Sequence, residues 1–365
     1  MTVGPQWTNR RFAKTLTANK GQKMIYVGMD ISSKDFMIYA VNERKKVSFK
    51  GSIAPSKQAL RKLIDDLGIE KKIFVFEAGN QMKWIADFFK KENQEIHVVH
   101  PNEVKWITQS SGKKTDKVDA KKLAELARAD MLPRRVVLAD GKARDLRELT
   151  AARQTLLSKR VSLMNTIRGY LKQEGVRLPA KFFVSNEWQV HLIGLKLRSS
   201  TESIVANLMY AVEQMQECEK GLNTEIQSID DEQIKLIETI PGIGKLSARI
   251  LFGALISAER FDNSKSVANY GALAPTIHQS GDMNHLGKIN RDGRSEVRRA
   301  MLQCAHAVAR TKTAAVKPLK EFFERIEKRR GKKRAIVALS RKLLTTVYGV
   351  MKSGETYNPG KLVAA

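Results

Sequence analysis

The sequence predicts an α/β domain followed by α-helical regions, and three observations support this fold class. Short apolar runs rich in β-branched and aromatic residues alternate with amphipathic segments before residue 100, which is typical of a sheet with covering helices. After residue 140 the chain changes to long polar stretches with helical periodicity. A Pro-Gly turn at residues 241–242, followed by another apolar-periodic stretch, marks the start of a mostly helical third region.

The first element is the apolar run 24–30, which is typical of a buried central strand and ends in Asp30. An ionised aspartate in that position is costly unless another group pairs with it. Two further runs, 36–41 and 47–49, follow after short polar breaks. Together the three runs predict an antiparallel three-stranded meander.

The pattern continues with a helix, a strand, a second helix and a second strand, over residues 56–67, 72–76, 82–91 and 96–99. Glu77 closes the first of these strands, so we expect its carboxylate at a strand tip beside Asp30. Pro101 marks the exit into a new segment. With the helix that follows, the order is βββαβαβα, which is the order of RNase H folds.

Asp116 and Asp119 open that next helix and share one of its faces, because they are three residues apart. Acidic residues in a first turn also cap and stabilise a helix, and for this pair alone capping is an equal alternative. Together with Asp30 and Glu77, however, they make four carboxylates that suit Mg²⁺ or Mn²⁺. Two such ions can activate an attacking oxygen and stabilise a leaving one, so this set implies phosphoryl transfer.

Charge favours a nucleic-acid partner. The chain carries 65 Lys and Arg against 38 Asp and Glu, a formal net charge of +27, which attracts polyanions. Residues 1–23 contain only basic charges and lack the apolar core of a signal peptide, so they are interpreted as a flexible basic arm. Residues 328–334 form a second basic cluster. Either could be a solubilising run, but together they favour nucleic-acid binding.

Several other classes are not expected. No apolar stretch approaches the ~18 residues of a membrane span. Cys218 and Cys304 are far apart and lack metal-type spacing, which predicts free thiols in a reducing, cytoplasmic environment. The 6 histidines include no pair at ligand spacing, so a zinc site is not expected.

The middle of the chain predicts two long amphipathic helices, near residues 143–174 and 202–230, separated by Pro179 and a polar and aromatic patch at 182–188. In the first helix, large apolar residues recur at spacings near three, four and seven. Such a seam does not specify its partner. Folding back within one chain and pairing with another subunit are therefore both open.

The third region begins with residues 236–245, which have the pattern of a helix-hairpin-helix. The glycines Gly242 and Gly244 would let backbone N–H groups approach a DNA phosphate at a helix N-terminus beside Lys245. A P-loop is excluded, because Leu246 follows the Gly-Lys pair and the first required glycine is missing. A plain turn between two helices is the alternative interpretation.

Further along, Ser280 and Gly281 on their chemistry alone indicate a turn. His278 is near in sequence but has no obvious orienting partner, so no catalytic triad is predicted.

From about residue 24 onward the chain resembles the DEDD-type insertion-sequence transposases, which are relatives of the Piv DNA invertase. Motifs in both halves of the chain, in the family's order, make the resemblance specific. They are Gly28-Met29-Asp30, Phe76-Glu77-Ala78, residues 114–120, residues 240–244, residues 271–275, Ser280-Gly281, and Gly293 with the Arg-rich helix after it.

The resemblance implies a RuvC-like RNase H fold at the N-terminus and a distinct C-terminal transposase domain. It also implies that the four carboxylates bind the divalent metals and that Ser280 is the nucleophile that becomes joined to a DNA phosphate. Relatives assemble as dimers and tetramers, with the metal site of one subunit near the serine of another. The family further implies an element-encoded bridge RNA that pairs with donor and target DNA.

The expected organisation is a basic arm (1–23), a catalytic domain (24–140), a helical linker and oligomerisation region (141–233) and a C-terminal transposase domain (234–355). The expected function is site-specific DNA recombination. One alternative is a RuvC-type junction-resolving nuclease that cuts with metal-activated water, and another is a non-enzymatic binding protein with a decayed metal site. Candidate nucleic-acid contacts, some of which could equally be solvated, are Lys113, Lys114, Gly242, Gly244, Lys245, Arg291, Arg294 and Arg298.

Overall fold

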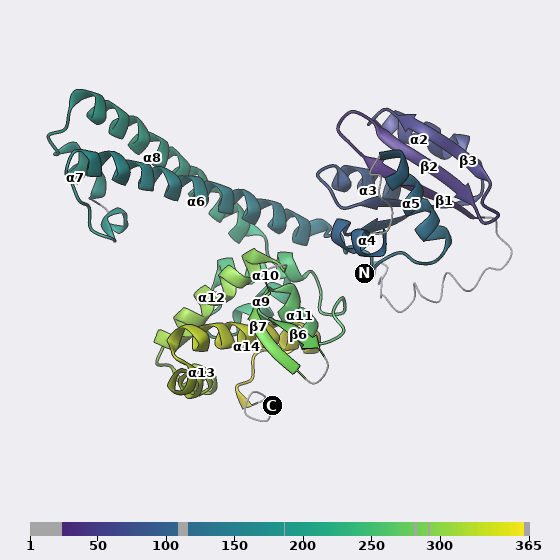
Figure 1. The fold of residues 1–365 in the computed structure, drawn as a ribbon. Coiled ribbons are helices and arrows are strands. Elements are labelled where there is room, and N and C mark those ends of the chain that lie inside the picture. Colours follow the sequence, from purple (N-terminus) through teal and green to yellow (C-terminus); the bar gives the residue numbers. More distant parts are fainter. Residues whose placement is uncertain (1–23, 109–115, 186, 281–282, 291–292, 361–365) are drawn as a thin grey trace. The chain divides into compact units, whose positions relative to one another are not determined.

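The protein is described by a computed structural model that covers residues 24–108, 116–185, 187–280, 283–290 and 293–360. It divides into two compact units, Met1–Leu138 and Ala139–Ala365 (Figure 1). The basic arm expected at residues 1–23 lies outside the described residues.

The first unit is built on a five-stranded mixed sheet with the order β3-β2-β1-β4-β5 (Figure 1). Strands β1 and β2 are antiparallel, as are β2 and β3, whereas β4 runs parallel to both β1 and β5. The strands are β1 (Met24–Ile31), β2 (Phe36–Asn42), β3 (Val47–Ile53), β4 (Lys71–Glu77) and β5 (Glu95–Val99).

The two faces of this sheet are covered by different helices. On one face Val27, Met29 and Phe74 pack with α2 and α3. On the other face Val75 and Tyr39 pack with α5. Because strand residues alternate between faces, β1 contributes to both cores. The helices of this unit are α2 (Lys57–Asp66), α3 (Met82–Lys91), α4 (Pro101–Thr108) and α5 (Asp116–Arg128).

The second unit begins with a long helical arm. Helices α6 (Gly141–Gln173) and α8 (Ser199–Ser228) pack against one another (Figure 1). They are antiparallel, because Arg153 donates to Asn223 at 2.6 Å while Arg160 pairs with Glu219 at 2.7 Å. The two long helices therefore pair within one chain, which was one of the two arrangements left open by the sequence.

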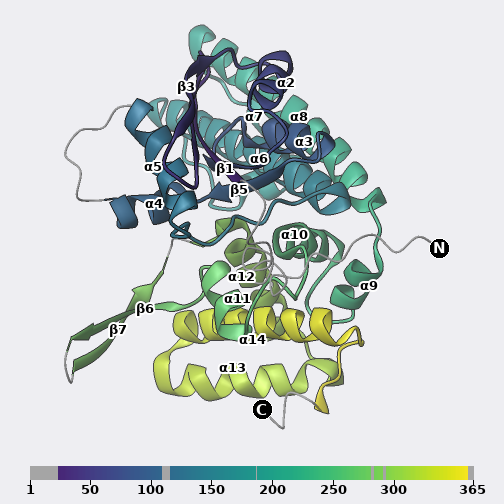
Figure 2. The ribbon, with the colours of Figure 1, turned by 90° about the vertical axis from the view of Figure 1, so that its right-hand side faces the viewer.

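The rest of the second unit packs around α14, whose side chains Leu339, Leu343 and Val347 are fully buried. A two-stranded hairpin extends from these helices (Figure 2). The elements are η1 (Phe182–Val184) and α7 (Trp188–Ile193) at the far end of the arm, then α9 (Glu232–Glu238), α10 (Lys245–Leu255), α11 (Ser264–Tyr270), β6 (Pro275–Ser280), β7 (Met283–Ile289), α12 (Ser295–Arg310), η2 (Ala314–Val316), α13 (Lys317–Arg330) and α14 (Lys332–Ser353).

A mixed α/β region followed by a mostly helical one was predicted, and the structure confirms this. Three details differ. An additional helix, α4, begins at Pro101 and precedes the predicted one, because proline is tolerated in a helix's first turn. Strand β3 extends to Ile53, since an edge strand with exposed side chains lacks the apolar run of a buried one. The hairpin β6–β7 was not predicted.

Cys218 is exposed and Cys304 is buried, and both are free thiols. None of the helices in the described ranges is long and apolar enough to cross a membrane.

His97 on β5 gives the first unit a pH dependence. Its Nε2 atom lies 2.9 Å from the carbonyl oxygen of Pro133. Burial lowers the pKa of His97 below its ordinary 6.5, and the charge of Arg135 acts in the same direction, although the hydrogen bond to Pro133 opposes them. As pH falls, His97 is protonated at a higher pH in the unfolded chain than in the folded one. Protonation therefore favours unfolding, and the free energy of unfolding decreases as pH falls below 6.5.

We expect His97→Gln, which can still donate to the Pro133 carbonyl, to flatten this dependence. The measurement is the urea midpoint at pH 7.5, 6.5 and 5.5. The exposed His306, changed to Gln, should leave the wild-type slope unchanged. Equal pH slopes for wild type and His97→Gln would remove His97 as the cause.

Candidate active site

Asp30 and Glu77 lie at the same end of the same sheet face. The parallel register of β1 and β4 pairs Met29 with Phe76, so the next residue of each strand stands beside the other. In-register neighbours of parallel strands point to the same face. Both residues are half-buried. The adjacency of these two carboxylates, expected from their strand-end positions, is thus built into the strand register.

Helix α5 lies directly on that face because of Gly28. A Cβ atom at Gly28 would stand 2.0 Å from the carbonyl oxygen of Ala120 and 2.6 Å from the backbone nitrogen of Ala124. Gly28 and Asp30 are two residues apart in β1 and therefore share a face. The missing side chain lets the helix backbone touch the strand that carries Asp30.

The direction of α5 follows from Tyr26, near the start of β1. Burial raises the pKa of the Tyr26 phenol, and the charges of Glu43 and Asp130 raise it further, whereas Arg128 lowers it. Arg128 ends α5 and Asp130 follows it, so the C-terminal end of the helix lies near the start of the strand. Helix α5 is therefore antiparallel to β1, and its first turn lies toward Asp30.

The spacings of helix and strand agree with this placement. Asp116 precedes Ala120 by one helical turn, about 6 Å along the axis. Asp30 follows Gly28 by two strand residues, about 7 Å. The first turn of α5, with Asp116 and Asp119, is thus brought level with the end of β1. Three separate elements converge there.

The side chains do not all converge. The carboxylate of Asp119 pairs with Lys122 at 3.4 Å on its own helix. The side chain of Asp116 lies outside the described residues. Among the residues that the structure does describe, no group of three or more acidic, histidine or cysteine side chains is close enough to hold a metal ion. The donor set suits a hard cation, because carboxylate oxygens are the ligands that Mg²⁺ and Mn²⁺ prefer.

We expect Gly28→Ala to destabilise the first unit by about 1–3 kcal/mol, because the added methyl meets backbone atoms of α5 that cannot rotate away. The urea midpoint measures this. Gly51→Ala is the matched control on the same sheet, since a Cβ there has only an ordinary 3.7 Å contact with Phe49. Similar small losses in both variants would mean that α5 does not depend on Gly28.

The hairpin β6–β7 carries Ser280. Ser280 ends β6 and pairs with Met283 across residues 281 and 282, which lie outside the described residues. The side chains of Ser280 and His278 are not described either. Ser280 thus lies at the end of a strand, and the turn expected at Ser280 and Gly281 includes residues outside the described ones.

The base of this hairpin is held firmly. The backbone nitrogen of Asn290 donates to Ala274 at 2.9 Å, and that of Arg294 donates to Tyr270 at 2.7 Å. A Cβ at Gly293 would stand 2.5 Å from the carbonyl oxygens of Asn269 and Tyr270. The base of the hairpin, and with it the strand that ends in Ser280, is therefore attached to the C-terminal end of α11.

Arginines surround Tyr270 at the base of the hairpin, and this cluster was not predicted from the sequence. Arg147 on α6 donates to the Tyr270 hydroxyl at 3.1 Å, and Arg260 at 3.4 Å. Burial lowers the pKa of Arg147 to about 10. Burial alone would raise the pKa of Tyr270, but the charges of Arg260, Arg147 and Arg294 outweigh it and lower that pKa below 10.0. This cluster joins the arm to the hairpin's base.

The turn between α9 and α10 contains the two glycines predicted to contact DNA. Gly242 has φ = +85° and fits against α12, where a Cβ would stand 2.4 Å from the Val308 side chain. Gly244 precedes α10, whose N-terminus has no side-chain cap, and a Cβ there would meet open space. Lys245 is exposed. Gly242 thus has a packing role, whereas Gly244 leaves the first amides of α10 accessible.

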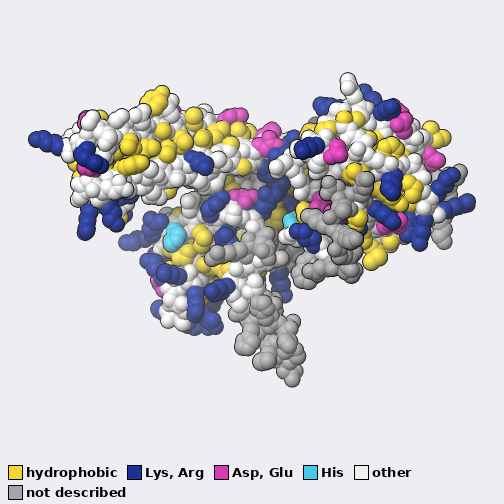
Figure 3. All heavy atoms as spheres, turned by 45° about the horizontal axis from the view of Figure 1, so that its top comes forward, with side chains coloured by type: hydrophobic (Ala, Val, Ile, Leu, Met, Phe, Trp, Pro, Cys, Tyr) yellow, Lys and Arg dark blue, Asp and Glu magenta, His cyan; other side chains and the backbone are white. Residues whose placement is uncertain are grey.

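The remaining candidate contacts with nucleic acid are Lys and Arg residues from both units. Lys113, Lys114 and Arg291 lie outside the described residues. Arg294 pairs with Glu296 at 3.2 Å, and Arg298 is half-buried on α12. On the face shown in Figure 3, Lys and Arg side chains outnumber acidic ones over both units.

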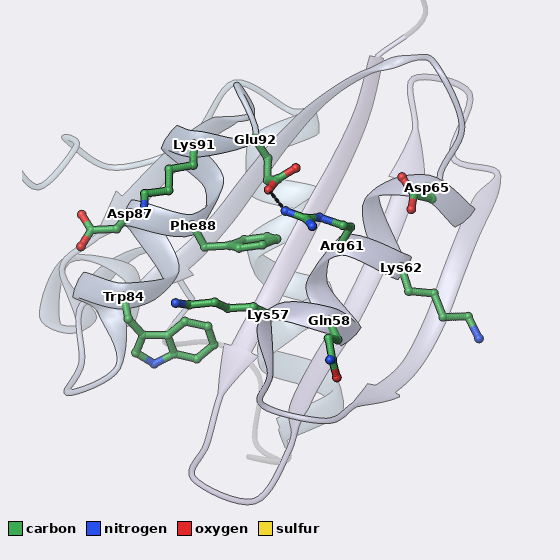
Figure 4. A pocket seen from close by; sticks show the side chains of 10 residues that line it. All are labelled: Lys57, Gln58, Arg61, Lys62, Asp65, Trp84, Asp87, Phe88, Lys91 and Glu92. Carbon is green, nitrogen blue, oxygen red and sulfur yellow. Dashed lines mark hydrogen bonds and ion pairs between the residues drawn. The ribbon is translucent and has the colours of Figure 1, made fainter.

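A separate groove of about 600 Å³ lies between α2 and α3, on the sheet face opposite α5 (Figure 4). Trp84 and Phe88 line it, and Arg61 pairs with Glu92 within it. Its four basic and three acidic side chains nearly balance. The groove therefore lacks the charge excess that a polyanion needs, and it is distinct from the carboxylates.

Two family models match the chain. The model DEDD_Tnp_IS110, described as "Transposase", matches residues 27–175. A second, described as "Transposase IS116/IS110/IS902 family", matches residues 234–320. The first match spans the strands and the helix that bring the carboxylates together, and the second spans the α9–α10 turn and the hairpin with Ser280.

Full-length relatives agree with these matches. The chain is 25% identical over 358 residues to the "Transposase for insertion sequence element IS1111A" of Coxiella burnetii, covering 96% of this chain and 95% of the relative. It is 27% identical over 290 residues to the "Pilin gene-inverting protein" of Moraxella bovis, covering 78% and 81%. It is 21% identical over 342 residues to the "Probable family 20 transposase" of Pseudomonas aeruginosa, covering 92% and 98%.

Proposed function

The chain belongs to the IS110/IS116/IS902 family of transposases, and from this premise we propose that it is a site-specific DNA recombinase that works through a covalent serine–DNA intermediate. Divalent metal ions at Asp30, Glu77, Asp116 and Asp119 would assist Ser280. The observation that carries the proposal is the antiparallel placement of α5 on β1 at Gly28, which brings acid-bearing ends of three elements to one edge of the sheet.

In this proposal residues 24–140, which include the described part of the first unit, form a RuvC-like RNase H-fold catalytic domain. Its mixed sheet and its two helical layers are compatible with that fold. Asp30 and Glu77 would hold a metal ion from neighbouring strands, and Asp119 would join them by leaving Lys122. Bound Mg²⁺ or Mn²⁺ supplies polarisation of the scissile phosphate and stabilisation of the charge that develops on it.

Ser280 would act as the nucleophile. Its hydroxyl oxygen attacks the phosphorus and loses its proton, while the bond from phosphorus to the 3′ oxygen breaks and that oxygen takes up a proton. The products are a serine phosphodiester on one DNA end and a free 3′-hydroxyl on the other. The phosphodiester energy is conserved, so a 3′-hydroxyl of a recombined partner can reverse the attack without ATP.

Donor and target DNA would be held through their backbones. In the C-terminal transposase domain, residues 234–355, the turn before α10 would act as a helix-hairpin-helix whose accessible amides, beside Lys245, contact phosphate. Arg294 and Arg298 on α12, with Arg291, Lys113 and Lys114, would neutralise further phosphates. These contacts read no sequence.

An RNA guide would supply the sequence specificity. A protein that binds backbone and duplex shape can delegate sequence reading to base pairing, as a bridge RNA encoded by the element would do. We assign residues 141–233 to assembly of a homodimer or homotetramer. In support, the far end of the arm exposes Val184, Val190 and Ile193, at 78%, 69% and 75% of their surface.

The first test of guidance is purification of the protein from its native genetic context, followed by sequencing of the nucleic acid that co-purifies. We expect a discrete RNA that maps to DNA flanking the gene. Random cellular RNA, recovered with intact and DNA-binding protein, would contradict guidance and favour a recombinase that reads DNA directly.

A second experiment separates recombination from RuvC-type junction cleavage. Labelled four-way junctions and DNA carrying the element's ends are each incubated with protein and Mg²⁺, then resolved under denaturing conditions. The proposal predicts protein-linked strands from the element ends. Cleavage confined to junctions, with all strands free of protein, would favour the metal-dependent endonuclease.

A further inference from the structure

Six basic residues lie within the seven positions 328–334, where α13 turns into α14; we call this segment the basic turn. All six side chains are exposed. Only Gly331, with φ = +78°, separates the two helices, which lie side by side (Figure 2). The cations are therefore concentrated at one end of a helical hairpin. They are Lys328, Arg329, Arg330, Lys332, Lys333 and Arg334.

These charges are not neutralised by the described parts of the chain. None of the six forms an ion pair or a side-chain hydrogen bond with a described residue. Other surface cations do so: Arg198 pairs with Glu174 at 2.8 Å and Lys220 with Glu217 at 2.6 Å. The basic turn thus keeps its charge available for an external anion.

Folding stability does not explain the cluster. The cations that end α13 are favourable there, because a helix C-terminus carries partial negative charge. The three that begin α14 are unfavourable, since a helix N-terminus is already positive. Helix α14 has no side-chain cap and no acid in its first turn to compensate. The three cations at the start of α14 therefore lower the free energy of unfolding.

The turn is nevertheless rigidly supported. Ala335 and Ile336, directly after it, are buried at 0% and 4% exposure. Leu319 and Phe323 on α13 are buried in the same core. The backbone that carries the cations is therefore held in place by the core. Less conformational entropy is then lost when the cations bind a partner.

The chemistry of the surface selects the partner. Single-stranded nucleic acid is held by exposed aromatic side chains on which bases stack. Phe323 is 5% exposed, and Phe322 is half-buried with Arg325 5.6 Å from its ring, so these helices present no open aromatic platform in the described chain. Neither Asn nor Gln occurs between residues 317 and 353 to read base edges. What is left is charge contact with a phosphate backbone.

We propose that the basic turn docks the phosphate backbone of double-stranded DNA, at a site distinct from the carboxylates and from Ser280. It lies beyond residues 234–320, the part of this region that matches the transposase family model. The contact adds affinity without sequence preference. This inference rests on DNA as the partner, which a transposase binds. It does not depend on the proposed attack by Ser280.

The test is a variant with four neutralised cations, Lys328→Gln, Arg330→Gln, Lys332→Gln and Arg334→Gln, in the full chain. Binding to duplex DNA of unrelated sequences is measured over a salt series. Each lost phosphate contact lowers the slope of log K against log salt by about 0.9, so we expect a slope lower by about 2–4. Affinity should fall about tenfold or more at low salt, equally for every sequence.

A matched control removes the same net charge from exposed cations that are already paired, Arg61→Gln, Arg198→Gln, Lys220→Gln and Lys235→Gln. We expect its salt slope to stay near that of the wild type. The thermal midpoint of the basic-turn variant should stay near that of the wild type, because two of the lost cations are favourable at the C-terminal end of α13 and the other two are unfavourable at the start of α14.

Wild-type affinity and salt slope in the basic-turn variant would overturn the proposal, as would an equal loss in the control. A loss confined to duplex RNA or to single strands would also overturn it. The outcome is independent of the proposed function, because binding is measured without Mg²⁺, whereas a failed serine mechanism would show as cleavage without a covalent adduct.

Discussion

Replacing Asp30 by Asn should abolish metal-dependent DNA cleavage, with a loss of about 10²–10³-fold or more. Asn keeps the shape of the side chain but removes the negative charge, which weakens a site whose cation affinity depends on ligand charge. Asp30 stands in register beside Glu77, so its loss leaves one strand-end carboxylate where two were adjacent. The measurement is single-turnover cleavage of DNA carrying the element's ends, at saturating protein.

The control for Asp30→Asn is Asp65→Asn on α2, at the groove on the opposite face of the sheet. It removes one charge from the same unit and should cut at the wild-type rate. Chelation of divalent ions should reproduce the Asp30→Asn defect in the wild type. If Asp30→Asn cuts normally, the carboxylates are not catalytic, and if every functional assay is indifferent to it, the protein is a binder with a decayed site.

The second large effect is expected for Ser280→Ala. The change removes the attacking oxygen, so strand cleavage should fall to background while DNA binding is retained. Binding should survive because Ser280 lies at the end of β6, whereas the hairpin's base is held by Asn290 and Arg294. Cleavage and binding are measured on the same labelled DNA.

Thr276→Ala is the matched control for Ser280→Ala. Its hydroxyl lies on the same strand and donates to the carbonyl oxygen of Lys288 at 3.0 Å on β7. Removing it tests whether any lost hydroxyl in the hairpin impairs cleavage, and we expect nearly wild-type rates. Cleavage by Ser280→Ala at the wild-type rate would assign the attack to water instead.

The carboxylate-bearing strands could be predicted from the sequence because their signals are local. The apolar run that ends at Asp30 and the one that ends at Glu77 each indicate a buried strand, and parallel neighbours then place both tips together. The antiparallel placement of α5 could not be predicted in the same way. It depends on Gly28 meeting Ala120 and Ala124, a contact between segments about 90 residues apart in the chain.

The features that escaped prediction share a physical cause, since their signals are non-local or weakly apolar. Strand β3 is an edge strand, and its exposed polar residues obscure the alternation of apolar and polar side chains that is typical of a strand. The hairpin β6–β7 has Gly and Asn within it, which also indicate loops. The arginines around Tyr270 come from residues 147, 260 and 294, and no periodicity links them.

The central claim is that a serine of this chain becomes joined to DNA. The most direct measurement is to stop a wild-type reaction with Mg²⁺ under denaturing conditions, digest the protein, and identify the peptide that carries a nucleotide. The proposal predicts a phosphodiester on Ser280 and a free 3′-hydroxyl on the other DNA end. Efficient cleavage that leaves a free 5′-phosphate and no modified peptide would contradict it.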